Sequence, residues 1–278
     1  MAGLLSVVCT PIGNLEDISK RALRVLNEAD VILAESIDNT RKLLNLLNVS
    51  LENKKILSCA QQEEPSRIKV VFERLDQGNK VALLSDAGAP NVSDPGGRIV
   101  EAVAQEGYAI EVIPGPSALV AALMGAGLIT NRFAFLGFLP RKGKERQKIV
   151  VDARKAGLAL VIYESPLRMA DTLADLAQWC GAVRVVVARE LTKHYETFHR
   201  GVLGSELSPP LVEKGEMVIV VEEGECAEEV SEVSKEEAIA STQQLIASGS
   251  LSTKDAARKL AKELNISSRK AYQLLIHL

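Results

Sequence analysis

Short, uniformly apolar segments alternate with amphipathic segments through the first part of the chain, and this alternation constrains the fold more than any other feature. Strands are predicted for four apolar segments, residues 4–8, 31–34, 81–85 and 110–113. Helices are predicted between them at residues 18–28, 40–47, 66–77 and 96–106. Strands that lack a polar face are typical of parallel sheets that helices cover on both sides. Residues 1–115 are therefore predicted to form an α/β domain with a parallel sheet.

A different pattern begins after Pro114-Gly115-Pro116. A helix rich in Ala is predicted from Ser117 to about residue 126, and another from Pro166 to Trp179, since proline is favoured in the first turn of a helix. Five further strands are predicted at residues 133–138, 158–163, 184–188, 197–201 and 217–221. Their connections are of mixed kinds, which favours a mixed sheet. We therefore expect a second α/β domain at residues 116–223.

The C-terminal segment changes its charge along its length. Residues 222–237 contain eight Glu and one Lys, and this lack of apolar material predicts an acidic, solvated linker at residues 224–237 that leads into a helix. Residues 251–278 contain six Lys or Arg and two acids. Ser252 and Asp255 have the spacing of a capping box, which predicts a helix to about Leu264, then a short turn and a second helix. Residues 238–278 therefore look like a basic helix-turn-helix, which fits either nucleic-acid binding or docking as a helical hairpin.

The composition excludes several classes of protein. The chain is 47% hydrophobic with a formal net charge of −3, so any surface that binds nucleic acid must be local. None of the four Cys has a C-x-x-C partner, and no stretch resembles a signal peptide or reaches about 18 apolar residues. His194 and His199 lack acidic or Cys neighbours at ligand spacing. We therefore expect a cytoplasmic protein with no membrane association and no metal site.

Three loops rich in glycine and proline follow predicted strands. They cover residues 10–14, 85–97 and 114–118. Ligands of open α/β sheets bind at the carboxyl ends of strands, glycine permits close approach of the backbone, and proline fixes the shape of a loop. The three loops together therefore predict a binding cleft. No G-x-G-x-x-G motif follows a strand, and Glu145 stands where a P-loop needs Ser or Thr, so neither a dinucleotide site nor a phosphate-transfer site is predicted.

Six segments resemble, in the same order, the motifs of a known family. They are residues 7–18, 85–96, 114–118, 137–140, 163–168 and 188–193. On these motifs the chain is similar to the ribosomal RNA small subunit methyltransferase I family, a branch of the tetrapyrrole methylase fold, over residues 4–223. The basic C-terminal hairpin also resembles the tail of that family. The resemblance implies two α/β domains with a donor-binding cleft between them and a small helical C-terminal hairpin.

The resemblance also implies a function. It implies S-adenosylmethionine as methyl donor, 2′-O-methylation of a cytidine ribose in 16S ribosomal RNA, the small ribosomal subunit or its RNA as partner, and a homodimer. Donor contacts are then expected from Pro11, Asp86, Ala87, Gly88, Ala89, Val92, Ser117, Ala118, Tyr163, Leu191, Glu216 and Met217. The chain departs from the family's motifs at Ser36-Ile37-Asp38, Cys59 to Gln62, Ala89 and Leu167. These departures affect the substrate more than the donor.

Methyl transfer needs alignment of the donor with the ribose oxygen and removal of one proton. Alignment can lower the activation barrier by as much as roughly 7–11 kcal/mol. The candidates to accept the proton are Glu35, Asp86, Asp94, Glu190 and, with a depressed pKa, Lys193. Their spacing does not distinguish them, and each single acid also suits a role as turn former or helix cap.

Several basic residues are candidates for RNA contacts. Arg189 and Lys193 are the first candidates to hold phosphate, because the arginine fork matches phosphate oxygens. Further candidates are Arg141, Lys142 and Lys144 near the cleft, and Arg269 and Lys270 in the tail.

Two other functions remain open. A methyltransferase of the same fold that acts on a tetrapyrrole or another small molecule would need no basic tail and would have apolar walls for a macrocycle. A non-catalytic RNA-binding relative would keep the fold without activity, and the polar residues missing at 36–38 and 59–62 are compatible with it. Donor binding would separate the non-catalytic protein from both enzymes.

Overall fold

The computed structural model describes residues 3–212, 214–224, 232–247, 251–263 and 268–276. The chain divides into two compact units, Met1–Glu225 and Cys226–Leu278. The larger unit contains two five-stranded sheets, and the smaller unit is helical. Each unit is described by itself.

The first sheet is built from the strands β1 to β5 in the order β3-β2-β4-β1-β5, and every pairing in it is parallel. The strands are Leu4–Val8, Val31–Ala34, Lys55–Ser58, Lys80–Leu84 and Ala109–Ile113. The helices are α1 (Lys20–Glu28), α2 (Ile37–Leu46), α3 (Glu64–Asp76) and α4 (Gly97–Gln105), with a 3₁₀ turn at Leu15–Asp17. The predicted parallel sheet is confirmed.

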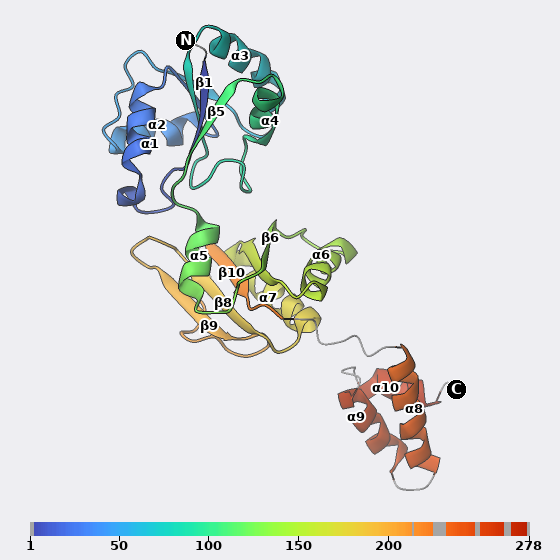
Figure 1. Ribbon diagram of the computed structural model, residues 1–278. Coiled ribbons are helices and arrows are strands. Elements are labelled where there is room, and N and C mark those ends of the chain that lie inside the picture. The colour runs from blue at the N-terminus through green and yellow to red at the C-terminus, as the bar shows by residue number, and fades with distance from the viewer. Residues whose placement is uncertain (1–2, 213, 225–231, 248–250, 264–267, 277–278) are drawn as a thin grey trace. The chain divides into compact units, whose positions relative to one another are not determined.

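Both faces of this sheet are buried. Ile32 of β2 packs with α1 and α2 on one face, while Val31 and Leu33 pack with α3 and α4 on the other. Figure 1 shows the two helix pairs on opposite sides of the strands. This arrangement explains why the strands lack a polar face. The strand β3 was not predicted, because it is a four-residue edge strand that begins with Lys and pairs only with β2.

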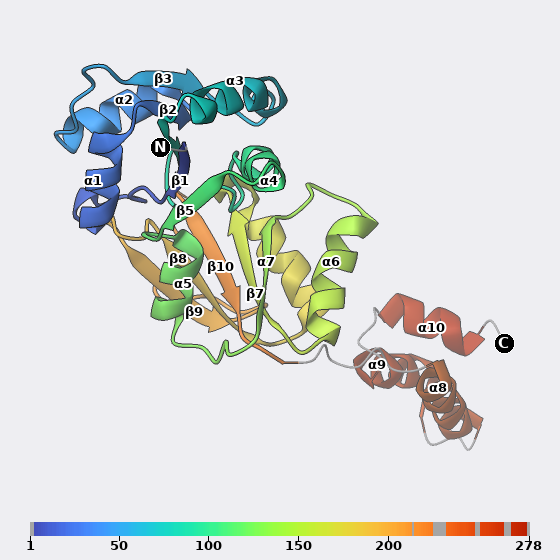
Figure 2. The same ribbon diagram turned by 45° about the horizontal axis from the view of Figure 1, so that its top comes forward.

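The second sheet has the order β6-β7-β10-β8-β9 (Figure 2). Its strands are Phe133–Phe138, Ala159–Glu164, Met217–Val221, Arg184–Arg189 and Thr197–Val202 in that order. Only β6 and β7 are parallel, so the predicted mixed sheet is confirmed. The helices α6 (Lys144–Lys155) and α7 (Pro166–Cys180) cover one face. The helix α5 (Ala118–Ala126) covers the other.

The last strand of the larger unit is anchored at its carboxyl end. Arg184 forms an ion pair with the Glu222 side chain, and the Arg154 Nη1 donates to the Glu222 carbonyl over 2.5 Å. The Glu223 amide donates to the Ile129 carbonyl over 3.2 Å. The first residues of the acidic segment therefore belong to the folded body.

The smaller unit contains three helices among its described residues: α8 (Glu232–Ala247), α9 (Thr253–Glu263) and α10 (Ser268–Ile276). Leu260, Ala261 and Ala271 form its core. Two expectations are corrected here. The helix α8 begins inside the segment expected to be a linker, because Glu, Lys and Ala favour helix and acids suit a helix N-terminus. The expected two-helix hairpin is therefore part of a three-helix unit. The predicted cap is confirmed, since the Ser252 Oγ accepts from the Asp255 amide at 3.2 Å.

Candidate functional site

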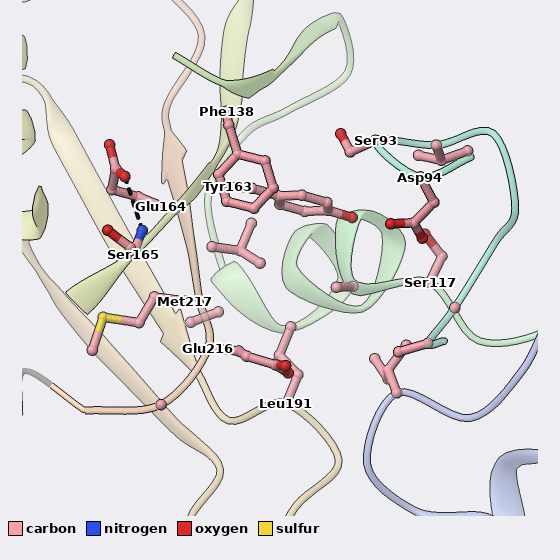
Figure 3. Close-up of a pocket in the computed structure, with 18 of the residues that line it drawn as sticks. Ser93, Asp94, Ser117, Phe138, Tyr163, Glu164, Ser165, Leu191, Glu216 and Met217 are labelled. Carbon is pink, nitrogen blue, oxygen red and sulfur yellow. Dashed lines mark hydrogen bonds between the residues drawn. The ribbon is translucent and has the colours of Figure 1, made fainter. Parts of the chain in front are cut away.

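A pocket of about 360 Å³ lies within the larger unit, where loops of the first sheet meet the second sheet (Figure 3). This volume is typical of a small-molecule site. Its walls come from residues 87–89 and 92–94 after β4, residues 117–118 at the start of α5, residues 163–166 at the end of β7 and residues 215–218 at the start of β10. Ile12, Phe138, Ala188 and Leu191 complete the lining. The carboxyl ends of the first parallel strands thus form one side of the pocket, as expected for such sheets.

The first two glycine- and proline-rich loops are joined by backbone hydrogen bonds. The Thr10 amide donates to the Gly88 carbonyl at 2.8 Å, and the Gly88 amide donates to the Thr10 carbonyl at 3.1 Å. Gly88 has a φ of +81°, and a Cβ at this position would lie 3.2 Å from the Ile12 Cγ2. The loop after β4 therefore needs glycine at the point where it lines the pocket.

Two of the candidate bases hold loops together instead of lining the pocket. The Glu35 Oε2 accepts from the Asp86 amide at 3.1 Å. The Asp86 carboxylate accepts from the Ser36 amide at 3.1 Å and from the Asn39 Nδ2 at 2.6 Å. These bonds fix the ends of β2 and β4 to each other, which is a shaping role. Pro11 and Asp86, both expected to touch the donor, are not among the lining residues.

Asp94 is the candidate base that lines the pocket. Burial raises the pKa of its carboxyl group to about 6, the negative charge of Glu35 adds to the rise, and a hydrogen bond with Ser85 opposes it. Figure 3 shows its carboxylate directed toward the hydroxyl end of Tyr163 and toward Ser117. A carboxylate with a pKa near neutrality is suited to accept a proton.

Tyr163 joins β7 to the first turn of α5 at the wall of the pocket. Its hydroxyl accepts from the Leu119 amide in the first turn of α5 at 3.1 Å, and burial raises its pKa. Its ring makes edge contacts with Phe135 and Phe138, with centroid separations of 4.9 and 5.7 Å. The ring is therefore a fixed wall of the pocket.

Glu190 and Lys193, also candidate bases, form a small ion-pair cluster beside the pocket. The Lys193 Nζ lies 3.1 Å from the Glu190 Oε1 and 2.9 Å from the Glu216 Oε2. The Glu190 Oε1 also accepts from the Glu216 amide at 2.8 Å, and this bond is the main cause of its lowered pKa. The pKa of Lys193 is raised, since its bonds to the two carboxylates outweigh the opposing effect of burial. The raised pKa does not fit the depressed pKa that a Lys193 base requires. The cluster holds Leu191 and Glu216, which line the pocket.

A buried carboxylate supports the wall formed by the end of β7. The Glu164 side chain has no exposed surface, and its Oε2 accepts from the Thr172 Oγ1 at 2.6 Å. Arg168 and Arg146 lie 3.4 and 4.0 Å from its two oxygens. A buried carboxylate of this kind is stable only when its hydrogen bonds and charge are matched, as they are here.

The residues expected from sequence to touch the donor make up half of the lining of this pocket. Ten of the twelve expected donor contacts line the pocket, all but Pro11 and Asp86. Nine lining residues were not assigned: Ile12, Ser93, Phe138, Glu164, Ser165, Pro166, Ala188, Gly215 and Val218. Phe138, Glu164, Ser165 and Pro166 lie inside the motifs at residues 137–140 and 163–168, and these motifs are the signal in the sequence that points to them.

The candidate RNA contacts fall in different places. Arg141 and Lys142 line a second, wider pocket of about 720 Å³ between α6 and α7, which shares Ser165 with the first. Lys144 begins α6 and is not a lining residue. Arg189 donates to the Lys214 and Tyr195 carbonyls at 2.6 and 3.3 Å, so its guanidinium is engaged within the protein. Arg269 and Lys270 lie at the start of α10, where their side chains are outside the described residues.

The first pocket is lined by acidic side chains, two of which are paired with basic groups of the protein: Glu164 with Arg146 and Arg168, and Glu216 with Lys193. Asp94, Glu164 and Glu216 line it, and no Lys, Arg or His does. The described residues contain no group of His, Cys, Asp and Glu that could hold a metal ion. No helix in the described parts of the chain has the length and hydropathy needed to cross a membrane.

Comparison with known proteins decides the family. Residues 4–206 match the model for tetrapyrrole (corrin/porphyrin) methylases. The chain is 37% identical to the ribosomal RNA small subunit methyltransferase I of Synechocystis, over 99% of this chain and 98% of the relative. It is 42% identical to the protein of the same name in Halalkalibacterium halodurans, over 79% of this chain and 76% of the relative. The chain belongs to the ribosomal RNA small subunit methyltransferase I family. The predicted family is confirmed.

Solved structures show the same fold at low identity. The methyltransferase CobJ matches with a TM-score of 0.61 and 19% identity, over 80% of this chain and 95% of CobJ. Diphthine synthase matches with a TM-score of 0.59 and 17% identity, over 79% of this chain and 90% of that chain. The tetrapyrrole methylase fold is confirmed.

Members of this family use S-adenosylmethionine, and this confirms the predicted cofactor. The residues of the first pocket fit that molecule, which carries a positive sulfonium. Asp94, the lining carboxylate that forms no ion pair with another described residue, complements the cation. The apolar walls at Ile12, Val92, Leu191 and Val218 suit its adenosine. The first pocket is from here on called the donor pocket, and the second the α6–α7 groove.

Proposed function

We propose that this protein transfers the methyl group of S-adenosylmethionine to the ribose 2′-oxygen of a cytidine in 16S ribosomal RNA. The observation that carries the proposal is a donor pocket with Asp94 in its wall and no Lys, Arg or His in its lining. Family membership supports RNA of the small ribosomal subunit as the substrate. Such a substrate places the activity in the cytoplasm.

The donor supplies a methyl group already activated by its sulfonium, so the protein has to position the ribose and remove its hydroxyl proton. We assign proton removal to Asp94. Its pKa of about 6 leaves the carboxylate mostly ionised at pH 7, yet more basic than an ordinary aspartate. Glu35 raises that pKa through its charge and acts as a positioning residue.

Substrate binding is assigned to the surface next to the donor pocket. Arg141 and Lys142 line the α6–α7 groove, and neither forms an ion pair with another described residue. Their charges are therefore available to phosphate oxygens. A homodimer remains a prediction from the family. The exposed Val120 and Met124 of α5 offer an apolar surface compatible with it.

The reaction is tested with small ribosomal subunits from cells that lack this protein. The purified protein and labelled S-adenosylmethionine are expected to label the small-subunit RNA, and one phosphodiester bond is expected to become resistant to alkali. The reason is that alkaline cleavage needs a free 2′-hydroxyl. Label on a base or on a small molecule would contradict the ribose assignment. Label on a small molecule alone would favour the small-molecule methyltransferase, and no label with intact donor binding would favour the non-catalytic relative.

The smaller unit provides a separate prediction about RNA capture. Removal of residues 226–278 is expected to leave the donor affinity unchanged, because the donor pocket lies within Met1–Glu225. It is expected to weaken RNA binding and flatten its dependence on salt, since the six Lys and Arg after residue 250 would release counterions from phosphates. Charge reversal at Arg269 and Lys270 is expected to reproduce part of the effect. RNA affinity at three salt concentrations measures both.

The competing role for this unit is docking. In that case, truncation would lower the melting temperature of residues 1–225 or dissociate a dimer, and the salt dependence of RNA binding would stay the same. Thermal unfolding and the mass of the truncated protein in solution distinguish the two results.

A further inference from the structure

The strand β6 contains a bulge immediately before the donor pocket. Phe135 pairs with Val161 of β7 and Gly137 pairs with Ile162, so Leu136 has no partner in the register. Gly137 has a φ of +58°, a left-handed conformation that favours glycine. Bulges of this kind redirect the side chains that follow them and are frequent beside active sites.

The bulge turns Phe138 toward the pocket. Residues three apart in a regular strand point to opposite faces of a sheet. Here Phe135 and Phe138 both contact the ring of Tyr163. The extra residue therefore places Phe138 on the same face as Phe135, where it lines the donor pocket.

Phe138 is nevertheless poorly covered by the protein. Its side chain is 59% exposed, although a large apolar ring stabilises a fold mainly when it is buried. Figure 3 shows it at one side of the pocket, with the Tyr163 ring between it and Asp94. Leu167, which lines the adjoining α6–α7 groove, is 96% exposed. Each of the two adjoining pockets thus presents one uncovered apolar side chain, Phe138 in the first and Leu167 in the second.

Phe138 is also held in this position by its neighbours in the chain. Leu139, the next residue, is buried, and its carbonyl accepts from the Arg168 Nη2 at 2.8 Å. The Pro140 carbonyl accepts from the Arg146 Nη1 at 3.0 Å. Both arginines are held by the buried Glu164. The backbone that follows Phe138 is therefore fixed, and the side chain leaves the strand at a set position beside the pocket.

We propose that Phe138 is a stacking platform for the base of the nucleotide that is methylated. This inference rests on the proposed function. A ribose whose 2′-oxygen lies beside Asp94 brings its attached base to the mouth of the donor pocket. In that position the base is no longer stacked on the neighbouring bases of the RNA. Unstacked bases in single-stranded RNA are held by aromatic rings, which offer a π-face and no hydrogen bonds. Arg141 and Lys142 in the groove beyond then meet the adjoining phosphates.

The test compares three variants of Phe138 with wild type on small ribosomal subunits at saturating donor. Phe138→Leu keeps an apolar side chain but removes the ring, and it is expected to raise KM for the subunit by about 5- to 30-fold, the loss of one base–aromatic stack. Phe138→Trp and Phe138→Tyr are expected to keep KM near the wild-type value. The turnover number is expected to change little, because stacking contributes equally to the ground state and the transition state.

Two controls separate stacking from other roles of the ring. Phe133→Leu removes a 43% exposed ring from the other end of the same strand, outside both pockets, and is expected to behave as wild type. The affinity of Phe138→Leu for S-adenosylhomocysteine is expected to match that of wild type.

Three results would overturn the inference. One is an unchanged KM in Phe138→Leu. Another is an equal loss of affinity for S-adenosylhomocysteine, which would assign the ring to the donor. The third is a KM for Phe138→Trp and Phe138→Tyr as high as that of Phe138→Leu, which would indicate a structural role. Absence of methyl transfer to RNA by the wild-type protein would instead overturn the proposed function, and this inference with it.

Discussion

Replacement of Asp94 by Asn is expected to lower the turnover number by about 10²- to 10⁴-fold, the usual contribution of a positioned general base. Asparagine has nearly the same shape but cannot accept a proton. Donor affinity, measured by calorimetry with S-adenosylhomocysteine, is expected to fall far less than turnover. Asp152→Asn, which alters an exposed carboxylate on α6, is the matched control and is expected to retain full activity.

The same carboxylate predicts the pH dependence of the reaction. The wild-type rate is expected to fall as pH decreases through about 6, because protonated Asp94 cannot act as a base. The negative charge of Glu35 raises the pKa of Asp94, so Glu35→Gln lowers that pKa. The variant is therefore expected to keep its activity to a lower pH than wild type. A flat pH profile, or the same midpoint in both proteins, would contradict the assignment.

Stability gives an independent check on Asp94. A carboxyl group whose pKa rises from 3.8 to about 6 on folding binds more protons in the folded state, so stability is lost as pH rises from about 4 to 6. At pH 7 the ionised, half-buried carboxylate therefore destabilises the fold. Asp94→Asn is expected to melt at a higher temperature than wild type at pH 7. A loss of turnover together with a lower melting temperature would point to misfolding.

Replacement of Gly88 by Val is expected to weaken donor binding by roughly 100-fold, at the upper end of the cost of overpacking a filled site. The Cβ alone would lie 3.2 Å from the Ile12 Cγ2, and the two methyl groups would extend into the donor pocket. Calorimetry with S-adenosylhomocysteine and the donor-induced rise in melting temperature measure the loss.

Gly107→Val is the matched control for Gly88→Val. Gly107 has a φ of +78°, close to the +81° of Gly88, but a Cβ there has no neighbour within 4 Å. Both variants carry the strain of a β-branched residue at positive φ, roughly 1–3 kcal/mol. Only Gly88→Val is expected to lose donor binding. An equal loss in the two variants would show that backbone strain, and not occupation of the pocket, is responsible.

The central strands of the sheets, β2, β4, β7, β8 and β10, could be predicted from sequence because they are buried on both faces. A short, uninterrupted apolar segment such as Val31–Ala34 is typical of a buried strand. The strand β3 and the helix α8 were missed or misplaced for opposite reasons. The first is too short and too polar to stand out. The second is so rich in Glu that its apolar positions, such as Ile239, gave no clear pattern.

The candidate base could not be chosen from sequence, because spacing does not reveal where a carboxylate points. Glu35 and Asp86 also follow strands, but their carboxylate oxygens accept hydrogen bonds from backbone amides. Asp94 comes after residues with positive φ, Asn91 at +68° and Ser93 at +66°. These turns bring it to the pocket. Positive φ outside glycine is a property of the folded loop that local sequence preferences do not determine.

Phe138 was missed for a related reason. Strict alternation along β6 places it opposite Phe135, away from the pocket. The bulge at Leu136 places Phe138 on the same face as Phe135. Gly137 is the residue in the sequence that indicates this bulge.

The contacts of Glu222 and Glu223 determine where a mechanical load on the C-terminal helices enters the larger unit. A load applied through the C-terminal helices reaches the larger unit at the carboxyl end of β10, where Arg154, Arg184 and the Ile129 carbonyl hold the chain. The opposite end of the same strand, at Met217, lines the donor pocket. The strand between them is hydrogen-bonded on both sides, to β7 and β8. Tension applied through the C-terminal helices is therefore resisted in shear along β10 before it reaches the end of the strand that lines the pocket.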